Sequence, residues 1–320
     1  MKFRLLAFSL TSLVVVIFDP SLRFADAAPL NGAVRVDGSS TVFPISEAVA
    51  EDFGAVHKSV RVTVGTSGTG GGFKKFCAGE IDVNNASRQI RDSELEQCRK
   101  NKITFIELPV AIDGLTVVVN PSNNFVSKIS LKDLKTIWEP NSKVKLWSDV
   151  NESWPKEKIQ LFGPGPDSGT FDYFTEDVVG KAKSCRTDYT ASEDDNMIIK
   201  GVAASRFSLG YFGHGYYMSN KNKVKALLID NGKTPVEPTD ANISNGTYPL
   251  ARQLFIYVSI ASTTKPQVDA FVNYYLENAK RLSTETGYLP LSDNDYKTAG
   301  DRYAKKTPGA SAPKRKPSKS

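Results

Sequence analysis

Histidine, cysteine and tryptophan are scarce in this sequence of 320 residues, which contains two, three and three of them, respectively. Neither histidine lies in the sequence context of a catalytic triad, and the cysteine spacing fits no common zinc site. The sequence also lacks the G-x-x-x-x-G-K-[ST] loop, the G-x-G-x-x-G dinucleotide motif and the G-x-S-x-G nucleophile motif. These absences weigh against nucleotide-dependent, metal-dependent and triad-based enzymes.

The sequence has no apolar run long enough for a comfortable membrane span. Its N-terminal run, Leu5–Phe18, follows two basic residues and precedes the small residues of Ala25-Asp26-Ala27. This order is typical of a secretory signal peptide that is cleaved after Ala27. We therefore predict that residues 1–27 are removed on export and that the mature protein is periplasmic.

The net charge of +6 is unevenly distributed along the chain. Residues 1–27 carry +1 and residues 305–320, KKTPGASAPKRKPSKS, carry +6, which leaves −1 for residues 28–304. The C-terminal stretch is rich in proline, serine and lysine and has no apolar pattern, so we expect a disordered basic tail. The region between the two ends shows no sign of a nucleic-acid surface.

Strand-like and helix-like patterns alternate along the chain, which predicts an α/β fold. Strands are expected at 33–37, 60–64, 80–83, 103–108, 115–120, 159–162, 208–212, 223–229 and 254–260, and helices at 44–53, 73–78, 93–100, 129–138, 196–206 and 267–279. Cys77 and Cys98 lie 21 residues apart on either side of one expected strand. Because an exported protein can form disulfides, we predict a Cys77–Cys98 bond and a free Cys185.

Four short loops of small polar residues come where an expected strand ends and a helix begins. They are Gly38–Thr41, Ser67–Gly72, Ala86–Arg88 and Asp167–Thr170. Such loops gather at the carboxyl edge of an α/β sheet, where backbone N–H groups, hydroxyls and helix N-termini surround an anion. Arg88 adds one guanidinium. Together the loops predict a site for a desolvated tetrahedral oxyanion, which needs hydrogen bonds on all sides when it is buried.

Each loop also has a simpler interpretation. The glycine-rich stretch VGTSGTGGGFKKF, Val64–Phe76, can be a linker, although linkers rarely lie between a strand and a helix inside a domain. Ser40, Thr41 and Ser168 can each be an ordinary helix cap. Only the four loops taken together favour an anion site.

Six stretches, in order along the chain, resemble the extracytoplasmic phosphate-binding proteins of bacterial phosphate ABC transporters. They are DGSSTVFPIS, GTSGTGGGFKKF, NNASR, AIDGLTVVVN, PDSGTFDYF and GYFGHGYY, and the similarity extends over nearly all of residues 33–304. The resemblance implies a type II periplasmic-binding-protein fold, in which two lobes, each a mixed sheet flanked by helices, are hinged by two crossover strands. Crossings near Leu115–Val118 and Leu254–Ser259 would give lobe 1 residues 28–117 and 256–304 and lobe 2 residues 118–255.

The same resemblance implies which residues bind phosphate in the cleft. Matched by motif, they are Ser40, Thr41, Val42, Ser67, Thr69, Ser87, Arg88, Ser168, Gly169 and Thr170. Two positions depart from the best-known members, which have an aspartate in place of Arg88 and an arginine in place of Pro164. In the family that aspartate accepts the proton of phosphate and so rejects sulfate. We hypothesise that Asp113 replaces it; the alternative is that Asp113 only caps a turn at the hinge.

These observations favour one function over three others. We predict a solute-binding protein, not an enzyme, that needs no cofactor or metal and delivers inorganic phosphate, as a monomer, to the permease subunits of an ABC transporter. The first alternative is a binder of sulfate, molybdate or a phosphonate. The second is a secreted phosphatase or a hydrolase built on Ser168, and the third is a protein that binds the cell wall through its basic tail.

Overall fold

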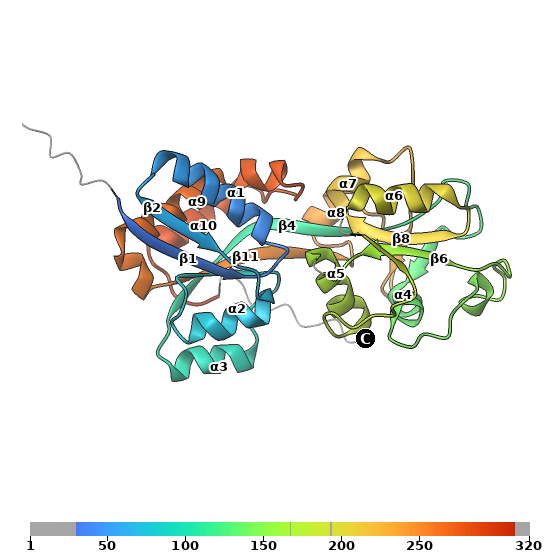
Figure 1. Cartoon of the computed structure of the whole chain (residues 1–320), viewed down its shortest axis with the longest axis horizontal. Helices are drawn as coiled ribbons and strands as arrows, with labels where there is room; N and C mark the ends of the chain where they lie inside the picture. The colour runs from blue at the N-terminus through green and yellow to red at the C-terminus, as the bar shows by residue number, and fades with distance from the viewer. Residues whose placement is uncertain (1–29, 167, 193, 311–320) are drawn as a thin grey trace, which may run out of the picture.

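The computed structural model describes residues 30–166, 168–192 and 194–310. The predicted signal peptide and most of the predicted tail therefore lie outside the described residues. Figure 1 shows two groups of helices and strands side by side, joined by the long strands β4 (Phe105–Val119) and β11 (Ala251–Ser259). The predicted α/β fold with two lobes is confirmed.

The pairing of β4 shows where one lobe ends and the other begins. Residues 105–114 of this strand pair with β11, whereas residues 115–119 pair with β8 (Ser208–Gly213). The outward crossing therefore lies at Gly114–Leu115, next to the predicted position. All of β11 pairs with lobe 1 strands, so we place the return crossing where β11 begins, at Leu250–Ala251. The predicted crossing, Leu254–Ser259, lies within this strand, and the predicted lobe boundaries stay a prediction. Below, lobe 1 means residues 30–114 and 251–310, and lobe 2 means residues 115–250.

One sheet runs through both lobes in the strand order β2-β1-β3-β11-β4-β8-β6-β7, with β9 beside β4, and a small second sheet pairs β10 with β5. The remaining strands are β1 (Gly32–Gly38), β2 (Val60–Val64), β3 (Val83–Ala86), β5 (Lys128–Ser130), β6 (Gln160–Pro164), β7 (Thr190–Ser192), β9 (Lys225–Ala226) and β10 (Leu228–Asp230). In lobe 1, β1 is parallel to β2 and β3, whereas β11 is antiparallel to β3 and β4. In lobe 2, β8 is antiparallel to β4 and parallel to β6. Both lobes thus have mixed sheets, as predicted.

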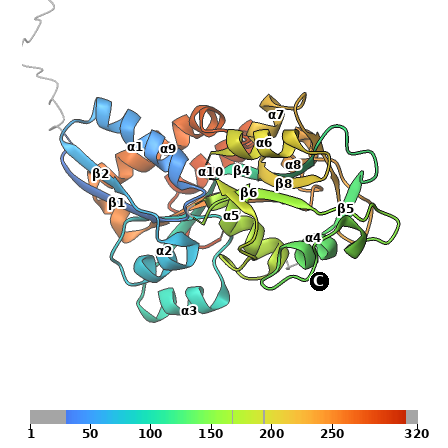
Figure 2. The same cartoon turned by 45° about the vertical axis from the view of Figure 1, so that its right-hand side comes forward.

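Helices cover the sheets of both lobes, and Figure 2 shows α1 and α2 on opposite sides of β1. Lobe 1 has α1 (Phe43–Val56), α2 (Gly68–Cys77), α3 (Asp92–Lys100), α9 (Pro266–Glu285) and α10 (Asp293–Ala304), and lobe 2 has α4 (Leu131–Trp138), α5 (Gly169–Phe174), α6 (Asp195–Ala204), α7 (His214–Ser219) and α8 (Asp240–Ser244). A π-helical segment, Thr175–Val179, continues α5, and short 3₁₀ turns occur at Trp147–Asp149 and Ala261–Thr264. Within the described part of the chain, no helix combines the length and apolarity that a membrane span requires.

Each lobe has a hydrophobic core of its own. In lobe 1, Val49 and Phe53 of α1 pack with Phe271 of α9 over the sheet, and all three side chains are fully buried. In lobe 2, Trp138 and Tyr211 lie in a core that is rich in aromatic rings. Each such side chain stabilises its lobe by roughly 1.5–3 kcal/mol through removal of apolar surface from water.

The predicted disulfide is present and joins two helices of lobe 1. The bond between Cys77, the last residue of α2, and Cys98 in α3 ties the helix that carries the glycines to its neighbour. Cys185 is free, as predicted.

Several local predictions need correction. The segments 103–108 and 115–120, predicted as two strands, belong to the single strand β4, and the strand predicted at 80–83 lies at Val83–Ala86. Helix α3 begins at Asp92, one residue before the predicted start of the helix at 93–100, and Arg91 is its cap residue. Helix α10 was not predicted, because its sequence has little apolar periodicity.

The boundary of the predicted tail also moves. Residues 305–310 pack on lobe 1, where Lys306 Nζ lies 2.5 Å from Asp269 Oδ1. The Gly309 N–H donates to Phe105 O (2.8 Å), and the Glu107 N–H donates to Gly309 O (3.2 Å). A proline- and lysine-rich composition did not reveal these backbone bonds, because they are independent of side-chain type.

Candidate anion-binding site

A cavity of about 290 Å³ lies between the lobes. Of the predicted site residues, Ser40, Thr41, Ser67, Thr69, Ser87 and Arg88 line it. The rest of its lining consists of Ser39, Gly68, Gly70, Gly71 and Arg91 from lobe 1 and Asp172, Glu176, Ala182 and Lys183 from lobe 2. Three of the four polar loops therefore meet at one place, at the carboxyl ends of parallel strands, as the loop pattern predicts.

The glycine-rich stretch is mostly helix, because α2 already begins at Gly68. A Cβ atom on Gly72 would lie only 2.0 Å from Asn84 Oδ1 and 2.6 Å from Gly38 Cα. Glycine is therefore required for α2 to pack directly on the ends of β1 and β3. The linker interpretation is wrong. The close packing brings the first turn of α2, with its free N–H groups, to the cavity wall.

Asp37, at the end of β1, fixes the start of this stretch. Its Oδ1 accepts hydrogen bonds from the backbone N–H (3.0 Å) and the hydroxyl (2.7 Å) of Ser67, and its Oδ2 forms an ion pair with Lys75. Burial alone would raise the pKa of Asp37, but the bonds from Lys75, Ser67 and Gly38 hold it below its ordinary value. Asp37 is therefore ionised at neutral pH and serves as an anchor of the loop.

Two hydroxyls at the floor of the cavity hold each other in place. The Ser87 N–H donates to Thr69 Oγ1 (3.1 Å), and the hydroxyl oxygens of Thr69 and Ser87 lie 3.0 Å apart. This link joins the start of α2 to the end of β3. It orients both hydroxyls before any ligand arrives, which lowers the entropy cost of binding.

Arg88 is held rigidly by carboxylates. Its Nη1 and Nη2 atoms form a two-point contact with Glu94, at 2.9 and 2.8 Å. Its Nε lies 3.6 Å from a Glu176 oxygen of lobe 2, and this buried Nε has no hydrogen-bond partner among the described residues. Glu94 itself accepts from the Arg91 N–H (2.8 Å) at the start of α3. The guanidinium of Arg88 is therefore fixed in orientation. Its Nε–H remains available to donate a hydrogen bond to a ligand.

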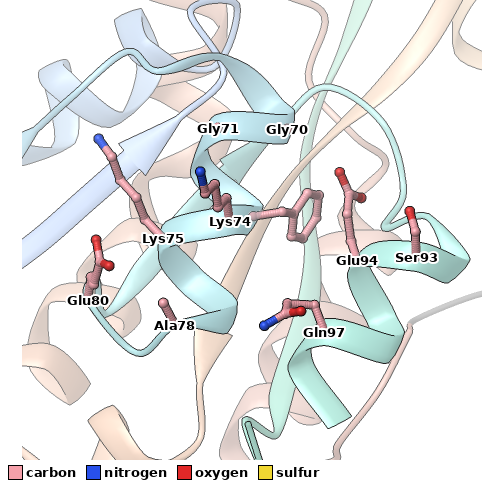
Figure 3. Close-up of a pocket in the computed structure, with 10 residues that line it drawn as sticks. Gly70, Gly71, Lys74, Lys75, Ala78, Glu80, Ser93, Glu94 and Gln97 are labelled. Carbon is pink, nitrogen blue, oxygen red and sulfur yellow. The ribbon is translucent and has the colours of Figure 1, made fainter. Parts of the chain in front are cut away.

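Figure 3 shows residues that line a second cavity. Its volume is about 710 Å³. It lies between α2 and α3, and Lys74, Lys75 and Gln97 line it. Glu94 lines this cavity and points toward Gly70 in this view. Gly70 and Gly71 line both cavities, so the start of α2 separates them.

The fourth loop joins the lobes but does not line the cavity. Ser168 caps α5 by accepting from the Thr170 N–H (3.1 Å), as its sequence context indicates. The Thr41 hydroxyl donates across the cleft to Gly169 O (3.1 Å), and a Cβ on Gly169 would lie 2.5 Å from Thr41 N. The lobes are therefore closed on each other, and Gly169 permits the contact.

Two predicted site residues lie elsewhere. Val42 is fully buried in the core of lobe 1. Asp113 is buried at the hinge, where its Oδ2 lies 3.3 Å from both Nε and Nη2 of Arg252. Burial raises the pKa of Asp113, and Arg252 partly offsets this shift. Arg252 also donates to Thr41 Oγ1 (2.9 Å) and stacks 3.7 Å from the Tyr173 ring centre, so Asp113 reaches the site only through this arginine.

The acidic wall of the cavity was missed by the sequence analysis. Asp172 Oδ2 accepts from the Ser40 hydroxyl across the cleft (3.4 Å), and Glu176 forms an ion pair with Arg91. The signal was available, because Ser168, Asp172 and Glu176 are four residues apart and such residues share one face of a helix. Arg252 left no comparable signal, since its partner is 139 residues away in the sequence.

Across residues 30–310 as described, no three histidine, cysteine, aspartate or glutamate side chains are grouped so that they could hold a metal ion. The cavity offers hydroxyls, backbone N–H groups, a guanidinium and carboxylates. This set suits hydrogen bonding to an oxyanion.

Comparisons with known proteins agree with this geometry. Residues 25–279 match the profile described as a PBP superfamily domain. The protein SphX of Synechococcus elongatus is 51% identical over 283 residues, which cover 87% of this chain and 83% of that protein. The phosphate-binding protein PstS of Staphylococcus epidermidis is 38% identical over 279 residues, covering 86% and 84% of the two chains.

Solved structures give the same result. A possible phosphate-binding protein from Planctomyces limnophilus has a TM-score of 0.84 at 49% identity and covers 87% of this chain and 99% of its own. An ABC-type phosphate transport receptor from Vibrio cholerae has a TM-score of 0.66 at 26% identity and covers 80% and 99%, respectively. The chain belongs to the PBP superfamily and, within it, to the family of SphX and PstS proteins.

Proposed function

We propose that this protein is the solute-binding component of an ABC transporter for inorganic phosphate, and that phosphate binds in the interlobe cavity. The observation that carries the proposal is the convergence of hydroxyls, α2 N–H groups and Arg88 on one small cavity between two hinged lobes. The names of the PstS relative and of the Vibrio cholerae receptor support phosphate as the ligand and transport as the role.

The donors that we assign to the ligand are the hydroxyls of Thr69 and Ser87, the backbone N–H of Ser40 and the guanidinium of Arg88. Thr41 lines the cavity, but its hydroxyl and N–H already donate to Gly169 O and Ser39 Oγ. Each hydrogen bond to a charged ligand contributes roughly 1.5–3 kcal/mol, so several of them offset the large cost of removing phosphate from water. We assign Ser67, Gly169 and Thr170, with the cap residue Ser168, to supporting the closed cavity wall. Val42 contributes through its backbone at the start of α1.

We further propose that β4 and β11 act as the hinge. Opening at Gly114–Leu115 and Leu250–Ala251 would separate Thr41 from Gly169 and expose the cavity to water. Closing would bury the ligand and create the shape that the permease recognises. We expect the protein to be a monomer that is exported to the periplasm with residues 1–27 as its signal peptide.

Calorimetric titration of the protein, after removal of bound anion, tests this function. We expect one phosphate per chain and no turnover of p-nitrophenyl phosphate, because the protein binds its ligand without cleaving it. Absence of phosphate binding would overturn the proposed ligand. Turnover that is lost in Ser168→Ala would instead support the hydrolase alternative.

A further inference from the structure

Arg252 lies at the hinge, in the second position of β11, and pairs with Asp113 of β4 across the antiparallel ladder. Each of these two residues is next to one of the proposed crossings between the lobes. Only 12% of the Arg252 side chain and 7% of the Asp113 side chain are exposed. Neither residue lines the interlobe cavity, as far as the described residues define it. Arg252 is therefore placed to act on the hinge and not on the ligand.

The guanidinium of Arg252 packs directly on lobe 2. Its central carbon lies 3.7 Å from the ring centre of Tyr173 in α5, and its Nη2 lies 3.5 Å from Gly169 O at the start of the same helix. Tyr173 is only 3% exposed. Because a cation over an aromatic face is attracted more strongly when water is excluded, this contact favours the closed arrangement.

Arg252 also orients a second contact between the lobes. Its Nη2 donates to Thr41 Oγ1 (2.9 Å). An arginine can only donate hydrogen bonds, so Thr41 Oγ1 is the acceptor and its own hydrogen must point elsewhere. That hydrogen is donated across the cleft to Gly169 O (3.1 Å). A single chain of hydrogen bonds thus runs from Asp113 at the hinge, through Arg252 and Thr41, to lobe 2.

We propose that Arg252 is a positioning residue that holds the two lobes closed around the bound anion. Its contacts with Tyr173 and Gly169 require closed lobes, because opening at the two crossings moves α5 away from β11. Asp113 keeps the guanidinium on lobe 1 when the lobes separate. This inference rests on the proposed function.

The proposal assigns Arg252 to ligand release. Contacts that form only in the closed protein must be broken before the anion can leave. Weakening them should therefore increase the rate constant of dissociation and leave that of association unchanged.

The test compares Arg252→Lys with Arg281→Lys. Lysine keeps a positive charge beside Asp113, but it lacks the planar fork that stacks on Tyr173 while bonding to Thr41. Arg281 is the matched control, since its carboxylate partners, Asp52 and Glu285, both belong to lobe 1.

Calorimetry gives the phosphate affinity of each protein, and release of radiolabelled phosphate from immobilised protein gives the dissociation rate constant. Their combination gives the association rate constant. We expect Arg252→Lys to bind phosphate about tenfold more weakly and to release it about tenfold faster. Arg281→Lys should behave like the unaltered protein. Equal behaviour of the two variants would overturn the proposal, and so would a loss of affinity that comes from slower association.

Tyr173→Leu provides a second, independent test, because it removes the ring and keeps Arg252. It should also release phosphate faster, and the double variant should lose little more affinity than either single variant, since both changes break one contact. Additive losses would overturn the proposal. If Arg252→Lys does not fold, unchanged release from Tyr173→Leu would overturn it.

The two levels of failure are distinguishable. An unaltered protein that does not bind phosphate would overturn the proposed function and, with it, the role of Arg252. An unaltered protein that binds phosphate, with variants that release it at the same rate, would overturn the role of Arg252 alone.

Discussion

The two lobes face the same cavity with opposite chemistry. Lobe 1 contributes hydroxyls, the first turn of α2 and the guanidinium groups of Arg88 and Arg91, whereas lobe 2 contributes the carboxylates of Asp172 and Glu176 and the amine of Lys183. Lobe 1 therefore carries most of the hydrogen-bond donors of the cavity, and lobe 2 carries its carboxylates. The difference teaches that the complete set of polar groups comes together only when both lobes are closed.

The lobes also differ in how they hold their shape. In lobe 1, the Cys77–Cys98 bond and the Asp37 anchor fix the helix that carries the glycines. In lobe 2, the described cysteine is free, and stability comes from packed aromatic rings, including all three tryptophans of the sequence. Lobe 1 therefore presents its donors on a cross-linked helix pair, and the tryptophans report on lobe 2 alone.

The largest effect is expected from removing the positive charge of Arg88 in lobe 1. Arg88→Gln should lower phosphate affinity by about 100-fold, because it deletes a charged donor and leaves Glu94 unpaired beside the ligand. Arg91→Gln is the matched control, since its side chain is 57% exposed and contributes at the rim, where about a threefold loss is expected. Calorimetric titration with phosphate measures both, and equal losses would contradict the assignment of Arg88.

The second prediction concerns the disulfide bond, which should stabilise lobe 1 and not lobe 2. Replacing Cys77 and Cys98 together by serine should lower the free energy of unfolding of lobe 1 by about 3 kcal/mol, because the unfolded chain is no longer closed into a loop of about 20 residues. In urea, the circular dichroism transition should shift more than the tryptophan fluorescence transition, which reports on lobe 2. Cys185→Ser is the control, and identical shifts of both signals would show that the lobes unfold as one unit.

The third prediction concerns a substitution that should prevent full closure of the lobes. Gly169→Ala places a methyl carbon 2.5 Å from Thr41 N, closer than van der Waals contact allows, so closure should be incomplete and phosphate affinity should fall about tenfold. Gly213→Ala is the control, because nothing lies within 4 Å of its added Cβ. Small-angle scattering with phosphate should show a larger radius of gyration for Gly169→Ala. An unchanged radius and affinity would mean that the Thr41–Gly169 contact is not needed.

Much of this arrangement was predictable because it depends on short stretches of sequence. Strand-end loops such as Gly38–Thr41 and the cap at Ser168 obey short-range rules, so their place at one sheet edge followed from the α/β pattern. The packing role of Gly72 was not predictable, since its reason is Asn84 Oδ1 and Gly38 Cα on neighbouring strands. The Asp113–Arg252 ion pair was not predictable for the same reason, because sequence patterns do not give the pairing of distant strands.

The central claim is that phosphate binds in the interlobe cavity and that the lobes close on it, and a comparison of anions tests this most directly. The protein, stripped of bound anion, is titrated with phosphate and with sulfate at pH 7 while tryptophan fluorescence follows closure. We expect tight binding of one phosphate per chain with a change in fluorescence, and no closure with sulfate. Equal binding and equal closure with both anions would contradict the account, because the cavity would then not be specific for phosphate.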